Sequence, residues 1–421
     1  MFNSVCRHLT AARRGLALPS MRPFSSIVSA GVEQNNKLRV AWADGHSSSF
    51  DLFHLRAWCT CPQCQHSTGQ RLVNIADAPA APRVDSVQVA SDGGVQIQWA
   101  GGDATPHASH FQASEIRKMC YDAASLDVIA ATPPALPATT AVSSVQYDDL
   151  SSDAGVLALC QHIMRDGLAI VRHVPSTRGQ VQVVAETIAP ISHTHLYGNV
   201  FDVVAEHNPV NIAYTSERLK LHLDLAYYES PPGLQLLHAL RYDPTVQGGD
   251  STFRDTFDAA ETLRVRHPEH FRTLTRVPAT FKKFHLDRAT PAILEYERPH
   301  IALNHRDEVV GVFWSPPFEG PLRVPAEDVG LYYEAYRAFD AIVQENVIQF
   351  KLEQGDLVIF NQRRMLHGRE AFSAGSDGVR HLQGTYVNID DFLCRYRTLE
   401  HKHGKKSEAA SPLFRTGNQS F

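Results

Sequence analysis

The alternation of hydrophobic and polar positions along the chain predicts many short strands. Near the N-terminus the alternation covers four stretches: 37–42, 47–53, 86–89 and 95–99. After residue 144, alternating or apolar runs bounded by Gly, Pro or Asp predict strands at 168–172, 210–214, 219–225, 233–240, 309–314, 356–361 and 380–388. Apolar residues at helical spacing predict helices at 149–165, 178–188, 255–267 and 327–347. Many strands with irregularly placed helices favour an antiparallel β core with helical insertions over a doubly wound parallel sheet.

Two segments rich in alanine and proline divide the chain. Residues 76–84 interrupt a small first domain, and the uncharged run Ala130–Val142 has the composition of a solvated spacer. We therefore expect a small β-rich domain over 33–130, a linker over 131–144 and a larger domain over 145–421. The expected fold class is α+β, mostly β.

The first 32 residues form a basic segment without acidic side chains. The first acidic residue is Glu33, and four arginines precede it. On a helical wheel, apolar side chains lie opposite Arg7 and Arg14, as in the amphipathic helix of a mitochondrial presequence. We expect a presequence over 1–32, in which Arg22-Pro-Phe-Ser resembles a matrix-protease cleavage site with the arginine three residues before the cut, and hence the mitochondrial matrix as the compartment. A disordered basic N-terminus is the alternative interpretation.

Charge and composition exclude several classes of protein. Lys plus Arg is 40 and Asp plus Glu is 45, which gives a net charge of −5 and does not favour nucleic acid as a partner. No apolar run reaches the roughly 20 residues that a membrane-spanning helix needs. Seven cysteines in 421 residues do not indicate a disulfide scaffold.

Three His-x-Asp tripeptides are candidate metal ligands, because residues i and i+2 of a strand point to the same face. Two imidazoles and one carboxylate on one face of an octahedron form the ferrous site of non-haem oxygenases and leave three positions open. The three tripeptides are His222-Leu-Asp224, His285-Leu-Asp287 and His305-Arg-Asp307.

The surrounding sequence favours the first tripeptide. His222 and Asp224 lie in the alternating stretch 219–225, so both are expected on the polar face of a half-buried strand. Asp287 instead precedes Arg288 and a Thr-Pro turn, which places its pair at the edge of a loop. The pair His285 and Asp287 stays as the alternative.

A histidine and an arginine near the C-terminus complete the set. His367 follows the buried strand predicted at 356–361 and is expected just past its end, facing a cleft. Arg380 opens the strand predicted at 380–388, and arginine holds a carboxylate through a bidentate fork.

This ordered set, with Gly248-Gly-Asp250 between its members, resembles the Fe(II)- and 2-oxoglutarate-dependent dioxygenases of the taurine-dioxygenase superfamily. The resemblance extends from about Lys37 to about Arg397. Within the superfamily the chain is similar to the γ-butyrobetaine and trimethyllysine dioxygenase family, through the segments Asn211-Ile-Ala-Tyr-Thr, Pro231-Pro-Gly-Leu-Gln-Leu-Leu-His, Leu366-His-Gly-Arg and Arg380-His-Leu-Gln-Gly-Thr-Tyr.

The resemblance implies a double-stranded β-helix (jelly-roll) catalytic domain and a set of cofactors. Iron would be held by His222, Asp224 and His367. The cosubstrate 2-oxoglutarate would be bound by Arg380, with a hydrogen bond from Ser251. The reaction would consume O2, release succinate and CO2, and use ascorbate as an accessory reductant. The family also implies a homodimer.

The small domain contains a candidate zinc site. Cys59, Cys61 and Cys64 provide three thiolates within six residues, and a structural zinc needs four N or S ligands. The resemblance implies that His107 is the fourth ligand; His110 and His66 are rivals. A redox dithiol or unbound cysteines are the alternatives.

The resemblance also implies a substrate pocket for a quaternary ammonium group, which aromatic faces recognise. The cage would consist of Tyr197, Phe201, Tyr214 and Tyr386, with Asn211 on the substrate carboxylate. Two positions depart from the family: Phe201 stands where tryptophan is common, and a second asparagine expected near residues 313–316 is absent, where Ser315 stands.

The implied reaction is hydroxylation of γ-butyrobetaine to L-carnitine. The first alternative is the same chemistry on trimethyllysine or another betaine-like zwitterion. A non-catalytic, cupin-like binding protein is the alternative from another class.

Overall fold

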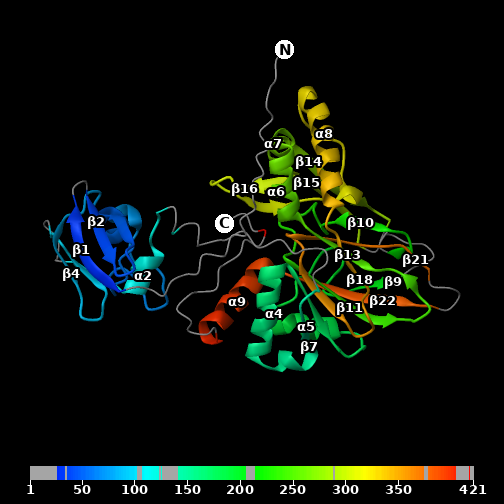
Figure 1. Ribbon diagram of the computed structural model, residues 1–421, viewed down its shortest axis with the longest axis horizontal. Helices are drawn as coiled ribbons and strands as arrows, with labels where there is room; N and C mark the ends of the chain where they lie inside the picture. Colours follow the sequence, from blue (N-terminus) through cyan, green and yellow to red (C-terminus); the bar gives the residue numbers. More distant parts are fainter. Residues whose placement is uncertain are drawn as a thin grey trace, which may run out of the picture. The chain divides into compact units, whose positions relative to one another are not determined.

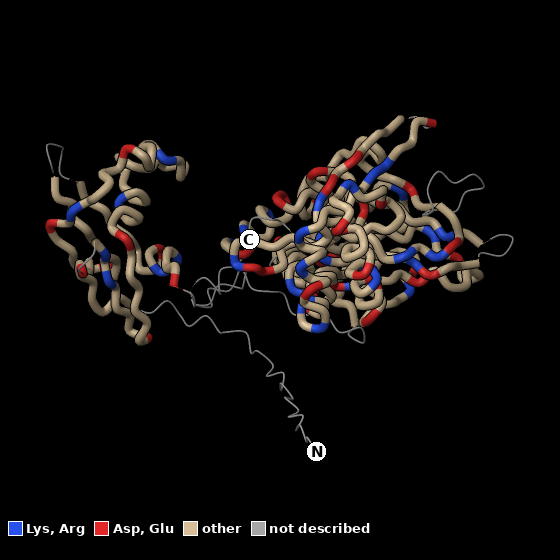
Figure 2. Tube along the Cα trace, turned by 90° about the horizontal axis from the view of Figure 1, so that it is seen from above, with Lys and Arg blue, Asp and Glu red and all other residues tan. Residues whose placement is uncertain are grey.

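The computed structural model describes residues 26–33, 36–101, 107–122, 125, 141–204, 214–287, 290–373, 378–403 and 417 (Figure 1). The chain divides into two compact units, with the boundary between Ala131 and Thr132. Each unit has its own hydrophobic core. Along both units, basic and acidic residues are interspersed (Figure 2).

The first unit contains two three-stranded antiparallel sheets, β1-β2-β3 and β4-β5-β6. In β2 the expected alternation holds, because Leu38, Val40 and Trp42 are buried and the residues between them face outward. The elements are β1 (Ile27–Glu33), β2 (Lys37–Trp42), β3 (Ser47–Asp51), α1 (Leu52–Ala57), η1 (Ile75–Asp77), β4 (Val84–Val89), β5 (Val95–Trp99), β6 (His107–Phe111) and α2 (Ala113–Lys118).

Two boundaries in this unit differ from the prediction. The strand expected at 47–53 ends at Asp51, because the side chain of Asp51 accepts hydrogen bonds from the backbone N–H groups of Phe53 and His54 and so caps helix α1. Strand β1 lies partly within the range 1–32 assigned to a presequence, since it pairs with β2 from Ile27 onward. The rest of that range, up to residue 25, lies outside the described residues.

Two facing β-sheets form the centre of the second unit. One has the order β7-β8-β19-β11-β22-β9 and the other β10-β20-β13-β18, and every pair but β7 with β8 is antiparallel. Side chains of both sheets share one core, in which Ile170 and Val358 meet Phe253 and Met365. The prediction of an antiparallel β core is confirmed.

Helices cover these sheets and form an insertion. Helices α4 and α5 pack on the six-stranded sheet, and α9 packs on α4 (Figure 1). The insertion between β13 and β18 contains α6, α7, α8 and two hairpins, β14–β15 and β16–β17. The bounds are β7 (Ser144–Gln146), η2 (Tyr147–Ser151), α4 (Asp153–Asp166), β8 (Leu168–Arg172), α5 (Gln180–Ile188), β9 (Phe201–Val204), β10 (Leu219–His222), β11 (Leu234–Tyr242), β12 (Gln247–Gly248), β13 (Ser251–Asp255), α6 (Thr256–Arg266), α7 (Pro268–Arg276), β14 (Pro278–His285), β15 (Ala292–Pro299), β16 (Ile301–Leu303), β17 (Val309–Val312), η4 (Pro316–Phe318), α8 (Ala326–Val343), β18 (Ile348–Phe350), β19 (Leu357–Asn361), β20 (Met365–Arg369), β21 (Phe372–Ser373), β22 (Arg380–Val387) and α9 (Ile389–His403).

Two predicted features of the second unit are corrected. The strand expected at 219–225 ends at His222. His367 does not follow a strand end, because a tight turn after β19 starts a new strand, β20, with His367 at its centre. The strand expected at 210–214 lies almost wholly outside the described residues. None of the described helices is both long and apolar enough to span a membrane.

Candidate metal centre and adjoining pocket

Two histidines face each other across neighbouring strands of the four-stranded sheet. His222 on β10 is the direct cross-strand partner of His367 on β20. Their rings lie 4.3 Å apart, centroid to centroid, and both side chains are buried. Nδ1 of His222 lies 2.8 Å from the carbonyl oxygen of Lys220, which can only accept, so this nitrogen carries a proton and Nε2 is the ring atom that faces Asp224.

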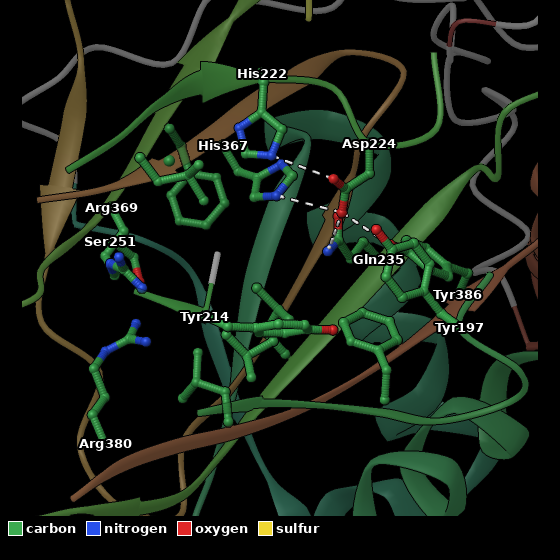
Figure 3. Close-up of a pocket in the computed structure, with 17 residues that line it drawn as sticks. Tyr197, Tyr214, His222, Asp224, Gln235, Ser251, His367, Arg369, Arg380 and Tyr386 are labelled. Carbon is green, nitrogen blue, oxygen red and sulfur yellow. Dashed lines mark hydrogen bonds and ion pairs between the residues drawn. The ribbon is translucent and has the colours of Figure 1, made fainter. Parts of the chain in front are cut away.

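Asp224 completes the cluster from just beyond β10. Its carboxylate oxygens lie 3.3 Å from Nε2 of His222 and 3.7 Å from Nε2 of His367 (Figure 3). The backbone N–H of Asp224 donates to Oε1 of Gln362 at 3.2 Å, and Leu225 after it has φ +59°. This local turn, and not a continuous strand, directs the carboxylate toward the two rings.

Two further side chains hold the carboxylate of Asp224. Nε2 of Gln235 and the hydroxyl of Tyr386 both donate to Oδ2 of Asp224, each at 2.9 Å (Figure 3). Oε1 of Gln235 is buried and has no hydrogen-bond partner among the described residues. The orientation of the carboxylate is thus fixed from two sides.

The charges of the cluster shift its pKa values in different directions. Burial raises the pKa of Asp224, but the hydrogen bond from His222 and the nearby imidazoles outweigh this and hold the pKa well below its usual range. Burial lowers the pKa of His367 to about 3, helped by the charge of His222. Burial also opposes the charged form of His222, yet the bond to Asp224 raises its pKa overall. The cluster therefore contains an ionised carboxylate.

These three side chains fit a divalent metal ion. One donor atom of each lies within 4.8 Å of the others, all buried or half-buried. Two imidazole nitrogens and one ionised carboxylate are the ligand set of ferrous oxygenase sites. The rival pairs His285–Asp287 and His305–Asp307 gather no third ligand among the described residues.

A pocket of about 700 Å³, its open mouth included, adjoins the cluster. Arg380, Ser251 and Arg369 line one side of it, away from Asp224 (Figure 3). Arg380 is 5% exposed, and burial lowers the pKa of its guanidinium. Its guanidinium also interacts with Tyr242, but its Nε is buried without a hydrogen-bond partner among the described residues, so this nitrogen can donate to an anion.

Aromatic rings line the opposite side of the pocket. The rings of Phe201 and Tyr386 stack at 5.2 Å, and Tyr197 lies 5.4 Å from Phe201. Tyr214 also lines the pocket (Figure 3). Asn211 lies outside the described residues. Ser315 is fully buried and does not line the pocket.

Four potential metal ligands also come together in the first unit. Nε2 of His107 lies 3.3 Å from the Sγ of Cys59, 3.7 Å from that of Cys61 and 3.6 Å from that of Cys64. The rival histidines have other partners: His110 pairs with Asp92 and His66 with Thr68.

The thiols of this cluster differ in acidity. Burial raises the pKa of Cys59 to about 11. Burial has the same effect on Cys61, but hydrogen bonds from Cys59 and from backbone N–H groups lower its pKa overall. Three thiols around one imidazole match the donor set of a structural zinc site.

Three residues of the site were not predicted from the sequence: Gln235, Gln362 and Arg369. The strand that contains Gln235 is predicted from its apolar residues. Gln235 is the one polar residue near the start of that strand, and this is the only signal for it in the sequence. Arg369 follows His367 by two residues, which is the spacing that places two side chains on one face of a strand.

Comparisons with known proteins match both units. The model of the "Taurine catabolism dioxygenase TauD, TfdA family" matches residues 131–386, and that of the "Gamma-butyrobetaine hydroxylase-like, N-terminal" family matches residues 32–117. The chain is 34% identical to gamma-butyrobetaine dioxygenase of Pseudomonas sp. (strain AK-1) over 90% of this chain and 97% of that relative.

A second relative and a solved structure are more distant. The chain is 28% identical to trimethyllysine dioxygenase of Meyerozyma guilliermondii, over 86% of this chain and 92% of the relative. A structure of asparagine oxygenase in complex with Fe(II), hydroxyasparagine and succinate is similar at a TM-score of 0.45 and 18% identity, over 65% of this chain and 98% of that one.

Proposed function

Because the chain belongs to the TauD/TfdA dioxygenase family and is an Fe(II)- and 2-oxoglutarate-dependent dioxygenase, we propose that it hydroxylates a trimethylammonium substrate, γ-butyrobetaine, to L-carnitine. One arrangement carries this proposal. A His/His/Asp cluster opens on a pocket with stacked aromatic rings on one side and, on the other, the Nε of Arg380, which has no hydrogen-bond partner among the described residues.

The residues of the cluster would act as the iron ligands. His222, Asp224 and His367 would hold Fe(II) through two imidazoles and one carboxylate. When bound, Fe(II) and 2-oxoglutarate supply the activation of O2 and the oxidising power for hydroxylation. Gln235 and Tyr386 keep Asp224 oriented, and the buried walls of the pocket exclude water.

Arg380 would bind the cosubstrate. Its buried guanidinium can form a charge-assisted, bidentate contact with the distal carboxylate of 2-oxoglutarate. Ser251, on the same side of the pocket, would add a hydrogen bond. Ascorbate would serve as the accessory reductant that the family resemblance implies.

The aromatic side of the pocket would hold the substrate's cationic head. Tyr197, Phe201, Tyr214 and Tyr386 offer ring faces, which attract a quaternary ammonium that cannot donate a hydrogen bond. Asn211 would bind the substrate carboxylate. Phenylalanine at 201 keeps the stacked geometry with Tyr386 but presents a weaker π face than tryptophan.

Trimethyllysine is the second candidate substrate. The departure at Ser315 is the observation that makes it a candidate, because a second asparagine that the family resemblance implies for the substrate carboxylate is absent there. The test is succinate release from 2-oxoglutarate and O2 with each compound and with no substrate. We expect the largest substrate-dependent rate with γ-butyrobetaine. A larger rate with trimethyllysine would select the alternative, and no coupled turnover with any betaine would favour a non-catalytic binding protein.

The cysteine cluster would hold a structural zinc ion. Three thiolates and His107 fill a tetrahedral coordination shell and leave no open position, which suits a structural role and not a catalytic one. This zinc would stabilise the small unit, whose core consists of few residues.

Location and assembly complete the proposal. The acid-free, arginine-containing segment before Glu33 supports import into the mitochondrial matrix, which a fluorescent fusion to this segment would test.

A homodimer is supported by the exposed apolar pair Phe284 and Ile293, which face each other across hairpin β14–β15 at 65% and 67% exposure. Light scattering of the purified protein would measure the assembly.

A further inference from the structure

Arg369 lies beside the candidate metal centre, in the same pocket. It follows His367 by two residues on β20, and both side chains line the pocket. Gly368 between them has no room for a side chain, because a Cβ would lie 2.6 Å from the carbonyl oxygen of Leu219 and 2.8 Å from Oγ1 of Thr252. The strand is therefore packed tightly between its two neighbours at this point.

Arg369 and Arg380 form a pair of buried cations on one side of the pocket (Figure 3). Each is 5% exposed, and the positive charge of Arg380 acts directly on Arg369. Among the described residues that line the pocket, the one acidic side chain is Asp224, which lies on the opposite side. Like charges repel strongly away from water, and a carboxylate bound at this side would offset that repulsion.

Arg369 also holds the segment 214–218, which leads into β10. Its Nη2 donates to the carbonyl oxygens of Thr215 at 2.8 Å and Glu217 at 2.5 Å. Tyr214, the first residue of this segment, lines the same pocket. The guanidinium of Arg369 thus lies on the same side of the pocket as Arg380, the proposed ligand of the cosubstrate. It also contacts the backbone of the segment that carries the ring of Tyr214.

We propose that Arg369 is a positioning residue that couples binding of the cosubstrate's distal carboxylate at Arg380 to the placement of the segment 214–218, and so of Tyr214. The inference rests on the proposed function. Without the carboxylate, repulsion from Arg380 weakens the hold of Arg369 on the two carbonyls. With the carboxylate bound, its single negative charge offsets the repulsion between the two cations, and the segment is fixed. Each ligand then tightens the binding of the other.

The test is the affinity for γ-butyrobetaine with and without 2-oxoglutarate, measured by calorimetry on the anaerobic Fe(II) protein, which cannot turn over. We expect 2-oxoglutarate to tighten binding about fivefold or more in the wild type, and less than about twofold in Arg369→Lys. Arg298→Lys is the matched control. Arg298 is equally buried and its Nη2 also donates to two carbonyls, those of Tyr228 and Glu229, but it does not line the pocket.

The outcomes are distinguishable. If wild-type protein binds neither ligand, the proposed function fails. If the wild type binds both ligands but shows no coupling between them, or if Arg369→Lys keeps the full coupling, Arg369 has no positioning role. If Arg369 were purely structural, its replacement would weaken binding of γ-butyrobetaine equally with and without 2-oxoglutarate. Should Arg369→Lys not fold, hydrogen exchange of wild-type residues 215–219 decides: we expect slower exchange on adding 2-oxoglutarate alone, and unchanged exchange would overturn the proposal.

Discussion

At the scale of single residues, Asp224 is the point at which the candidate metal centre, the aromatic side of the pocket and the protein framework meet. Its Oδ2 accepts from Gln235 on β11 and from Tyr386 on β22, and its backbone N–H donates to Gln362. A carboxylate held by two donors is oriented before any ligand binds, which lowers the entropy cost of metal binding.

Replacing Gln235 by leucine removes one of these donors and nearly preserves the volume. We expect the affinity for Fe(II), or for Co(II) as its spectroscopic substitute, to fall by about 10-fold or more. Metal titration in the absence of 2-oxoglutarate measures it. Gln383→Leu is the control, because Gln383 is also buried but contacts Gly179 and Asp202 and does not line the pocket. Equal affinities of the two variants would contradict the role of Gln235.

Residue chemistry also explains which parts of the site could be predicted. His222 and Asp224 are polar side chains on one expected strand face, Arg380 stands at an expected strand start, and His367 is expected just past a strand end. Gln235 could not be found in this way, because its role depends on Asp224 reaching it across the sheets, eleven positions away in the chain. Long-range contacts of this kind leave no local pattern.

At the scale of elements, the packing of β22 against β9 determines the aromatic side of the pocket. Gly384 on β22 pairs with Phe201 on β9. A Cβ at residue 384 would lie 2.4 Å from the Phe201 ring and 3.0 Å from Cδ2 of Leu237. The missing side chain therefore makes room for the ring that stacks on Tyr386.

The variant Gly384→Ala is expected to displace Phe201 and weaken substrate binding by about 10-fold, in line with an overpacking cost of about 1–3 kcal/mol. Binding of 2-oxoglutarate should change little, because Arg380 lies on the other side of the pocket. Calorimetry with each ligand measures both effects. Gly311→Ala is the control, since a Cβ there meets only ordinary contacts at 3.5 Å. Loss of both ligands to the same extent would indicate general unfolding instead.

The helical insertion contains a buried histidine that makes stability depend on pH. Nδ1 of His300 donates to the carbonyl oxygen of Phe313 at 2.6 Å, and Nε2 accepts from Tyr332 of α8 at 2.7 Å. Burial lowers the pKa of His300 to about 4. At pH values between about 4 and the unfolded pKa of about 6.5, the unfolded chain binds more protons than the folded chain. The free energy of unfolding therefore decreases as the pH falls through this range.

We expect the wild type to lose on the order of 3 kcal/mol more than His300→Gln when the pH falls from 7 to 4, measured by urea unfolding. The exposed His305→Gln serves as control and should follow the wild type. Parallel pH profiles of the wild type and His300→Gln would contradict this account.

Element boundaries were less predictable than element types. The alternation at 219–225 continues in the sequence past His222, yet the chain turns there because the backbone N–H of Leu223 bonds the carbonyl oxygen of Trp314 in the insertion. Strand β20 was missed because it is short and its polar and apolar residues do not alternate, and its partners β10 and β13 are distant in the chain. Tertiary pairing, not local pattern, defines such strands.

At the scale of the whole molecule, the chain combines two units with separate cores and separate candidate metal sites. We expect the small unit to depend on a zinc ion at its four clustered ligands more than the large unit depends on iron, because the small unit has the smaller core. Loss of the zinc should therefore unfold the small unit selectively.

Elemental analysis is expected to find one tightly bound zinc per chain, absent in Cys64→Ser. The variant should lose one thermal transition and keep the iron-dependent one, because metal binding and folding of a small site are one process. Cys160→Ser is the control, since Cys160 is buried in α4 of the other unit. Full zinc content in Cys64→Ser would contradict the site.

The central claim is that His222, Asp224 and His367 hold iron beside a keto acid that Arg380 anchors. The most direct test is a crystal structure of the anaerobic protein with Fe(II) and 2-oxoglutarate, using anomalous scattering at the iron edge. We predict a single iron peak in the second unit, bonded to these three side chains, with the distal carboxylate of 2-oxoglutarate on Arg380. Iron bonded elsewhere, or a carboxylate away from this guanidinium, would contradict the account.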